Sequence, residues 1–487
     1  MEEIIVAASC GSIRGNKTEG GYQFLGIPYG KVARFRAPEP VSWRGVKDCR
    51  NYGPKALQPN YLGVKPEGVP LLVQGSEDCL NLNVWTKSID REARLPVVVY
   101  VHGGAFQIGS NAVPGRSGDR FMEDEAMVFV SVNYRLGVLG FLQLGEEYEE
   151  TYAPSGNNGM KDLLLAIRWV RENIRDFGGE PSSITFLGIS AGAKAIASLI
   201  TLPEVQAVCH RMVLESGAMQ AFRSKKTADE IYRRYLDYLP KGVYLPEVSG
   251  AELIRAQAAF CGREGSTCFF GPVLDEEFFS SQWKNDWRQG LRWSGKAIIG
   301  CGKRELVPLT EKPAFAAHRE QILQDLFGDN SPVAWEKYRE LKRQGKKDAQ
   351  AWGTVLSDFM YRSYSDGLAR QLEQERNQVW CYSFEYPPAF HGMGFHFLMD
   401  QWNLPVFGVQ EEQMEEVRSL AALFRSAIRK FILSGDPGTE RLQWPQYEGK
   451  NKMIFDAIPH MESRRHDTLE GFPKQVFCLE KKHAVST

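Results

Sequence analysis

The chain has 487 residues, of which 43% are hydrophobic and 24% charged, and its formal net charge is −1. This composition is typical of a globular protein with a sizeable core, and it lacks the basic excess that nucleic acids or anionic membranes attract. We expect one domain over residues 1–487, because an elaborated α/β sheet with insertions can absorb this length.

The N-terminal residues are acidic where a secretory signal is basic, and no run approaches the ~18 apolar residues of a membrane-spanning helix. The nine cysteines are scattered without metal-ligand spacing, which favours reduced thiols. Cys261 and Cys268 are near enough in sequence to pair, although two free thiols are favoured. We therefore predict a cytoplasmic protein with no membrane anchor, metal or organic cofactor.

A glycine pair follows the first strong strand. The apolar run 97–101 leads directly into His102, Gly103, Gly104 and Ala105. The backbone of such a loop can aim N–H groups at an anion, so the pattern predicts part of an oxyanion hole.

Alternating strand and helix patterns follow. Apolar positions from Leu163 to Phe177 recur every three or four residues, and a second such stripe from Val417 to Phe431 ends at Gly435. Strands with apolar residues on both faces are typical of a parallel sheet covered by helices. The predicted strands are 97–101, 127–132, 184–187, 212–214, 297–299 and 379–384. Segments 54–75 and 311–347 are interpreted as insertions over one end of the sheet, either a lid or solvated surface.

Residues 188–192, Gly-Ile-Ser-Ala-Gly, lie between a β-branched strand and a helix-favouring stretch. This pattern predicts a sharp strand-to-helix turn that exposes Ser190 as a nucleophile above the sheet. The amide of Ala191, directly after the serine, would complete the oxyanion hole with the amides of Gly104 and Ala105.

With both motifs in place, the chain resembles the type B carboxylesterases, the α/β-hydrolases that include cholinesterases and bacterial para-nitrobenzyl esterases. The resemblance implies an α/β-hydrolase fold, a mostly parallel doubly wound sheet with insertions forming a lid or gorge, and hydrolysis of carboxylic esters. The segments that carry it, in chain order, are 24–30, 35–40, 76–85, 133–137, 156–162, 177–181, 434–437 and 444–445.

A serine nucleophile needs a histidine base and an acid that orients it, in the chain order serine, acid, histidine for this fold. The loop after strand 379–384 carries two histidines, His391 and His396. The family usually has an acidic residue three or four positions after the base and a Phe-Gly pair soon after. Asp400 and the pair at 407–408 fit His396, so the pattern favours His396 and keeps His391 as the alternative base.

Glu305, five residues after the glycine that ends strand 297–299, resembles the family's acid, and Asp275 is held in reserve. The chain departs from the family at Arg304 and Leu306, which flank that glutamate, and at Ile189, where relatives commonly have glutamate. Ser216 resembles a second serine that lies near the base in relatives.

The resemblance has two further implications. Secreted relatives pair the cysteine that matches Cys79 with one that falls at Ala56, so that disulfide cannot form here. The family also implies an aromatic-lined pocket for small to medium esters, for which the candidates are Phe106, Phe269, Phe270, Phe359 and Trp402.

We therefore expect a serine carboxylesterase, a monomer or weak homo-oligomer acting on a small-molecule ester through Ser190, Glu305 and His396. One alternative is an amidase or peptidase that uses the same residues. Another is a non-catalytic cholinesterase-like binding protein, which the retained serine argues against.

Overall fold

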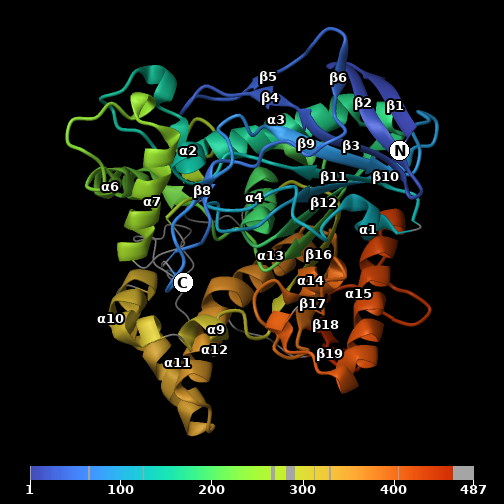
Figure 1. The fold of residues 1–487 in the computed structure, drawn as a ribbon. Coiled ribbons are helices and arrows are strands. Elements are labelled where there is room, and N and C mark those ends of the chain that lie inside the picture. The colour runs from blue at the N-terminus through green and yellow to red at the C-terminus, as the bar shows by residue number, and fades with distance from the viewer. Residues whose placement is uncertain are drawn as a thin grey trace.

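The fold is built on a thirteen-stranded sheet that crosses the computed structural model of the protein (Figure 1). The structure describes residues 2–463 except 64–65, 124, 265–268, 281–290, 312, 328–330 and 404. Along the sheet the strand order is β1-β2-β3-β9-β11-β10-β12-β13-β16-β17-β18-β19, with β6 paired to β2.

The middle of this sheet is parallel. All six strands predicted from the sequence are present in it, and a seventh, β18, extends it. The parallel strands, in their order across the sheet, are β11 (Val128–Val132), β10 (Leu95–Val101), β12 (Gly179–Ile189), β13 (Arg211–Glu215), β16 (Lys296–Gly302), β17 (Gln378–Phe384) and β18 (Asn451–Phe455).

Antiparallel strands extend both ends of the sheet, and the sequence analysis did not predict them. They are β1 (Glu2–Ala8), β2 (Gly11–Thr18), β3 (Gly21–Pro28) and β9 (Asn81–Thr86) on one side and β19 (His460–Ser463) on the other. The short strand β6 (Val46–Asp48) pairs with β2 in parallel. Short two-stranded pairs lie outside the sheet: β4 (Gly30–Lys31) with β5 (Glu39–Pro40), β7 (Gln58–Pro59) with β8 (Val73–Gln74), and β14 (Arg223–Ser224) with β15 (Val273–Leu274).

Helices cover both faces of the sheet, as β10 demonstrates. Val97 and Val99 belong to one hydrophobic core and Val98 and Tyr100 to another, because successive side chains of a strand point to opposite faces. The predicted helical stripes form α3 (Asn158–Asn173), with a 3₁₀ turn to Phe177, in the first core and α15 (Met414–Ser434) in the second. The doubly wound α/β class is confirmed.

The remaining helices connect the strands or extend beyond the sheet. Segment 311–347 forms α10 and α11, which share a small core with α12 on one side of the molecule (Figure 1). Its role as a lid stays a prediction. The helices other than α3 and α15 are α1 (Gly118–Met122), α2 (Gly137–Phe141), α4 (Ala191–Leu199), α5 (Pro203–Gln206), α6 (Lys225–Leu236), α7 (Gly250–Glu264), α9 (Val307–Thr310), α10 (Pro313–Phe327), α11 (Ser331–Arg343), α12 (Asp348–Ser357), α13 (Ser363–Gln374) and α14 (Met393–Leu398).

Within the described ranges, no helix combines the length and the hydropathy needed to cross a bilayer. The seven cysteines described there, Cys261 among them, are all buried. Cys268, its suggested partner, lies outside the described residues.

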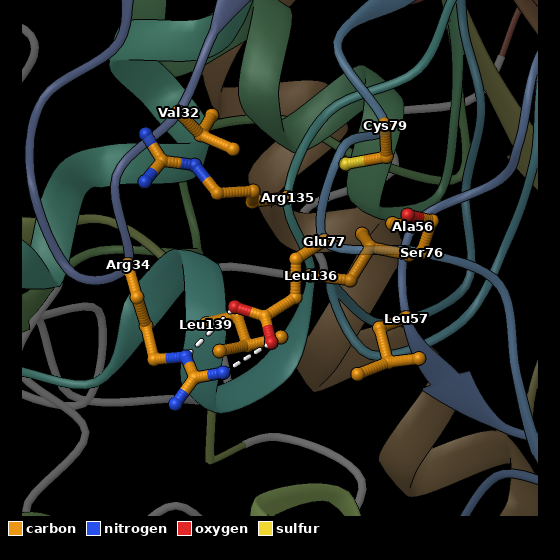
Figure 2. A pocket seen from close by; sticks show the side chains of 10 residues that line it. All are labelled: Val32, Arg34, Ala56, Leu57, Ser76, Glu77, Cys79, Arg135, Leu136 and Leu139. Carbon is orange, nitrogen blue, oxygen red and sulfur yellow. Dashed lines mark hydrogen bonds and ion pairs between the residues drawn. The ribbon is translucent and has the colours of Figure 1, made fainter. Parts of the chain in front are cut away.

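Ala56 and Cys79 line the same small cavity next to the ion pair between Arg34 and Glu77 (Figure 2). The cavity measures about 10 Å³, which is room for about one water molecule. Ala56 and Cys79 are 2% and 1% exposed, and Ala56 pairs with Ser76 across an isolated bridge. The position that the resemblance pairs with Cys79 thus lies at the same small cavity as that cysteine, with alanine in place of the second thiol.

We predict that Ala56→Cys forms a disulfide with Cys79 under oxidising conditions. Closing a loop of this size raises the free energy of unfolding by about 2–4 kcal/mol, chiefly by restricting the unfolded chain. Thiol titration of the denatured protein should lose two thiols relative to the reduced variant, and the thermal midpoint should rise. Ala56→Ser is the control without a thiol, and an undiminished thiol count after oxidation would contradict the prediction.

Candidate active site

Ser190 occupies a sharp turn between β12 and α4. Its φ and ψ are 55° and −121°, a backbone conformation that non-glycine residues rarely adopt. The turn is held by hydrogen bonds from Ser190 N to Glu215 O and from Lys194 N to Ser190 O, both 2.9 Å. Gly192 is required because a Cβ there would lie 2.0 Å from the Val101 carbonyl oxygen. The predicted strand–turn–helix geometry is therefore present.

The loop after β10 lies against this turn. A Cβ built on Gly103 would be 3.1 Å from Ser190 Cβ, so the two segments are in contact. Gly104 has φ +116°, and its carbonyl accepts hydrogen bonds from Gln107 N and Ile108 N. Within the described part of the chain, the amides of Gly104, Ala105 and Ala191 donate no hydrogen bond. Unused backbone donors thus gather beside the serine.

His391 is the histidine that faces the serine. Its Nε2 is 2.8 Å from Ser190 Oγ, and its Nδ1 bonds to Glu305 Oε2. The ring contacts Tyr361 at a centroid distance of 4.9 Å. The side chain stays 31% exposed, so the imidazole remains within reach of solvent and of a substrate.

Glu305 follows β16 and is 2% exposed. Its Oε1 accepts hydrogen bonds of 2.6 Å from Ser216 Oγ and from Gly302 N, which leaves Oε2 for His391. The reserve acid, Asp275, is used elsewhere: its carboxylate accepts from Asn157 Nδ2 and from the amides of Phe278 and Phe279. Ser190, His391 and Glu305 thus form one hydrogen-bonded chain in which each group has the partner that nucleophilic catalysis requires.

Known proteins resemble this chain along most of its length. A model described as "Carboxylesterase family" matches residues 2–471. The chain belongs to the carboxylesterase family. It is 30% identical to para-nitrobenzyl esterase of Bacillus subtilis, over 94% of this chain and 96% of that protein, and 30% identical to phenmedipham hydrolase of Pseudarthrobacter oxydans, over 93% and 94%.

Solved structures of the family give the same fold. A crystal structure of a Geobacillus stearothermophilus carboxylesterase is superimposable with a TM-score of 0.85 at 29% identity, covering 96% of this chain and all of that one. A para-nitrobenzyl esterase structure gives a TM-score of 0.80 at 28% identity, over 97% and 99%. The fold is the α/β-hydrolase fold, and the chain is a carboxylic ester hydrolase.

The prediction that His396 lies next to Ser190 is wrong, because His391 occupies that place. His396 lies inside α14, with its ring against Phe407 at 5.1 Å and a buried Nδ1 that has no partner in the described part of the chain. Burial, with a smaller contribution from the charge of Arg116, lowers the pKa of His396 to about 4.

The residues that favoured His396 have structural roles. Asp400 accepts a hydrogen bond from Trp402 Nε1 and pairs with Arg120 and Arg425. Phe407 stacks on Phe390 at 5.6 Å as well as packing on His396. The spacing between His396 and Asp400 therefore matches the family pattern, but the Asp400 carboxylate binds two arginines and an indole.

A second buried carboxylate, Glu215, fixes the segment that carries the base. It ends β13, is 4% exposed, and lies where a Cβ on Gly394 would be 3.0 Å from each of its oxygens. Burial and the nearby Glu305 raise its pKa to about 8, while the amides of Phe395 and Gly394 act in the opposite direction. The sequence analysis did not single out Glu215.

The five aromatic candidates for pocket walls are all buried. Phe106 packs on Phe141 at 4.9 Å, Phe359 on Phe327 at 4.3 Å and Phe269 on Phe260 at 4.3 Å. Their burial, and that of Phe270 and Trp402, is equally consistent with core packing, so their role in substrate binding stays a prediction.

Proposed function

We propose that this carboxylesterase works in two steps through an acyl-enzyme on Ser190. His391 takes the proton of Ser190 Oγ as that oxygen attacks the ester carbonyl, and then gives the proton to the leaving alcohol. Glu305 holds the imidazole in one tautomer and stabilises the imidazolium. Water, activated by the same histidine, then attacks the acyl-enzyme and releases the acid.

The amides of Gly104, Ala105 and Ala191 are proposed to bind the oxyanion of each tetrahedral intermediate, with Gly103 supplying the close approach of the loop. Their lack of other acceptors within the described residues supports this role. Losing one such donor typically costs about 100- to 1000-fold in turnover. Ser216 and Gly302 would hold Glu305 through both steps.

The observation that carries the proposal is the continuous hydrogen-bonded chain from Ser190 through His391 to Glu305. It contains a nucleophile, a base within 2.8 Å of it, and a buried acid. No separate observation favours an amidase or a binding protein, so both remain outcomes of the test.

The test is a panel of 4-nitrophenyl esters of increasing acyl length, assayed before and after treatment with a 4-nitrophenyl dialkyl phosphate. We expect turnover of the esters, release of one equivalent of 4-nitrophenolate from the phosphate, lasting loss of activity, and a phosphorylated peptide that contains Ser190. Faster hydrolysis of the matching 4-nitroanilide would indicate the amidase. No turnover and no adduct would indicate the binding protein.

A further inference from the structure

A π-helical turn of five residues, 358–362, joins α12 to α13 in one continuous helical run (Figure 1). We call these five residues the π-turn. Because such a turn contains more residues than an α-helical one, it changes which face of the run is apolar. Phe359 belongs to the small core of α10–α12, whereas Leu368 in α13 belongs to the first core of the sheet. The Ser363 hydroxyl closes the turn by donating to the Asp358 carbonyl at 2.6 Å. Insertions of this kind are frequent at functional sites.

The π-turn and the end of α12 are bonded to the segment that carries Glu305. Arg362 Nη2 donates to the carbonyl of Lys303 at 2.7 Å, two residues before the acid. The amide of Leu306, directly after the acid, donates to Ser357 Oγ at 3.0 Å. The chain is therefore fastened on both sides of Glu305.

Arg362 is held in place by a second partner. Its Nη1 lies 2.7 Å from Asp358 Oδ1, four residues earlier, and its side chain is only 16% exposed. A guanidinium presents its donors in a rigid planar fork, so one ion pair fixes the direction of the remaining N–H groups. Since hydrogen bonds from a charged donor are stronger than neutral ones, Arg362 is suited to hold the Lys303 carbonyl.

The same π-turn contacts the base. Tyr361 is 6% exposed, and its ring centroid lies 4.9 Å from that of His391 and 5.0 Å from Lys194 Nζ. Lys194 belongs to α4, the helix that begins directly after Ser190. An ammonium group over a tyrosine ring is attracted by the electrons of the ring, which adds to the packing that holds Tyr361. The ring is thus fixed against both the nucleophile helix and the base, and it restricts the positions that the imidazole can adopt.

A third link reaches the serine that supports the acid. The carbonyl of Met360 accepts a hydrogen bond of 3.1 Å from Gln220 Nε2, and Gln220 Oε1 accepts one of 2.7 Å from the amide of Ala218. These residues continue the segment of Ser216, whose hydroxyl donates to Glu305. The π-turn therefore contacts the segments of the acid, the base and the supporting serine, which follow the three different strands β16, β17 and β13.

We propose that Arg362 and Tyr361 are positioning residues of this esterase, which hold Glu305 and His391 in the alignment that proton transfer requires. The inference rests on the proposed function and deepens it. Arg362 acts through the turn that carries the acid, and Tyr361 acts through the imidazole. Loss of this alignment slows every step that passes a proton through His391, whereas binding of the ester precedes those steps and is unaffected. A displacement of about 1 Å at reacting groups can cost about 100-fold in rate.

The experiment measures kcat and KM for a short-chain 4-nitrophenyl ester, with active sites counted by the 4-nitrophenolate that a 4-nitrophenyl dialkyl phosphate releases. Counting the sites removes any contribution from misfolded protein. Arg362→Met should lower kcat per site about ten- to a hundredfold, while KM stays within about threefold of the wild type. Arg362→Lys keeps the charge without the planar fork and should lose less.

Tyr361→Leu tests the contact with the base. It should lower kcat per site by about tenfold with little change in KM, and Tyr361→Phe, which keeps the ring, should recover most of that loss. A higher KM with unchanged kcat in Tyr361→Leu would make the ring a substrate contact and overturn its positioning role.

Arg429→Met is the matched control. Arg429 in α15 is buried, donates to the carbonyl of Phe121 at 2.7 Å and pairs with Glu123 at 2.7 Å, so it has the same kinds of partner as Arg362 but at the end of α1. It should lower the thermal midpoint and leave kcat per site unchanged. An equal fall in kcat per site in Arg429→Met and Arg362→Met would reduce the effect to general destabilisation and overturn the proposal.

Unchanged kcat per site in a folded Arg362→Met would also overturn the proposal. Should that variant fail to fold, Arg362→Lys and Tyr361→Leu decide the question, and unchanged kcat per site in both contradicts the inference. The wild type separates this result from the proposed function. If it hydrolyses no ester and releases no 4-nitrophenolate from the phosphate, the proposed function itself is wrong.

Discussion

His391→Gln should lower kcat/KM for 4-nitrophenyl esters on the order of 10⁴- to 10⁶-fold, whereas His396→Gln should stay within about tenfold of the wild type. His391 is the side chain that bridges Ser190 and Glu305, and glutamine cannot accept and return the proton. His396 packs on Phe407 inside α14, where its loss affects local packing only.

The measurement is steady-state kinetics on a short-chain ester, with the thermal midpoint recorded for each variant to confirm that it folds. Both substitutions remove one imidazole from the same six-residue segment, 391–396, so each is the control for the other. A loss of several powers of ten in the His396 variant, with His391→Gln active, would reverse the assignment of the base.

Ser190→Ala should abolish detectable ester turnover, with a loss on the order of 10⁵- to 10⁶-fold, while the fold is retained. The acyl-enzyme cannot form without Oγ, so the variant should also give no burst of 4-nitrophenolate and no phosphorylated peptide. The residual rate should reflect only binding and the oxyanion donors.

Ser190→Gly separates the chemistry of this residue from its strain. Ser190 has φ 55° and ψ −121°, a conformation that destabilises a non-glycine residue by about 1–3 kcal/mol. Alanine at this position is strained to the same extent, whereas glycine adopts the conformation with much less strain. The glycine variant should therefore be as inactive as Ser190→Ala but unfold at a higher temperature. An equal or lower midpoint would show that the turn stores no strain.

The sequence patterns predicted those parts of the site that are formed by residues close together in the chain. The serine turn needs a strand, two glycines and a helix within a short stretch, and the loop at Gly103 needs a strand followed by small residues, so both were predicted from adjacent residues. The six parallel strands were also found, because burial on both faces leaves continuous apolar runs. The antiparallel strands at the edges leave weaker patterns and were missed.

The choice of base failed for a physical reason. The expectation was an acid three or four residues after the histidine, and only Asp400 met it. In the structure Gly394 occupies the position three residues after His391, and the carboxylate against it belongs to Glu215, which comes from β13. An acid that comes from a distant strand has no fixed spacing from the histidine in the sequence. The rule of an acid three or four residues after the base therefore favoured the wrong histidine.

The sequence by itself determined the family and the α/β class, and it located the candidate nucleophile, the candidate oxyanion loop and the candidate acid, since each depends on residues that are neighbours in the chain. Only the tertiary structure decided which imidazole faces Ser190 and that Glu215 lies against the base segment. These are relations between separate segments, and they are settled by how β13, α14 and the loop after β10 pack around the end of the sheet.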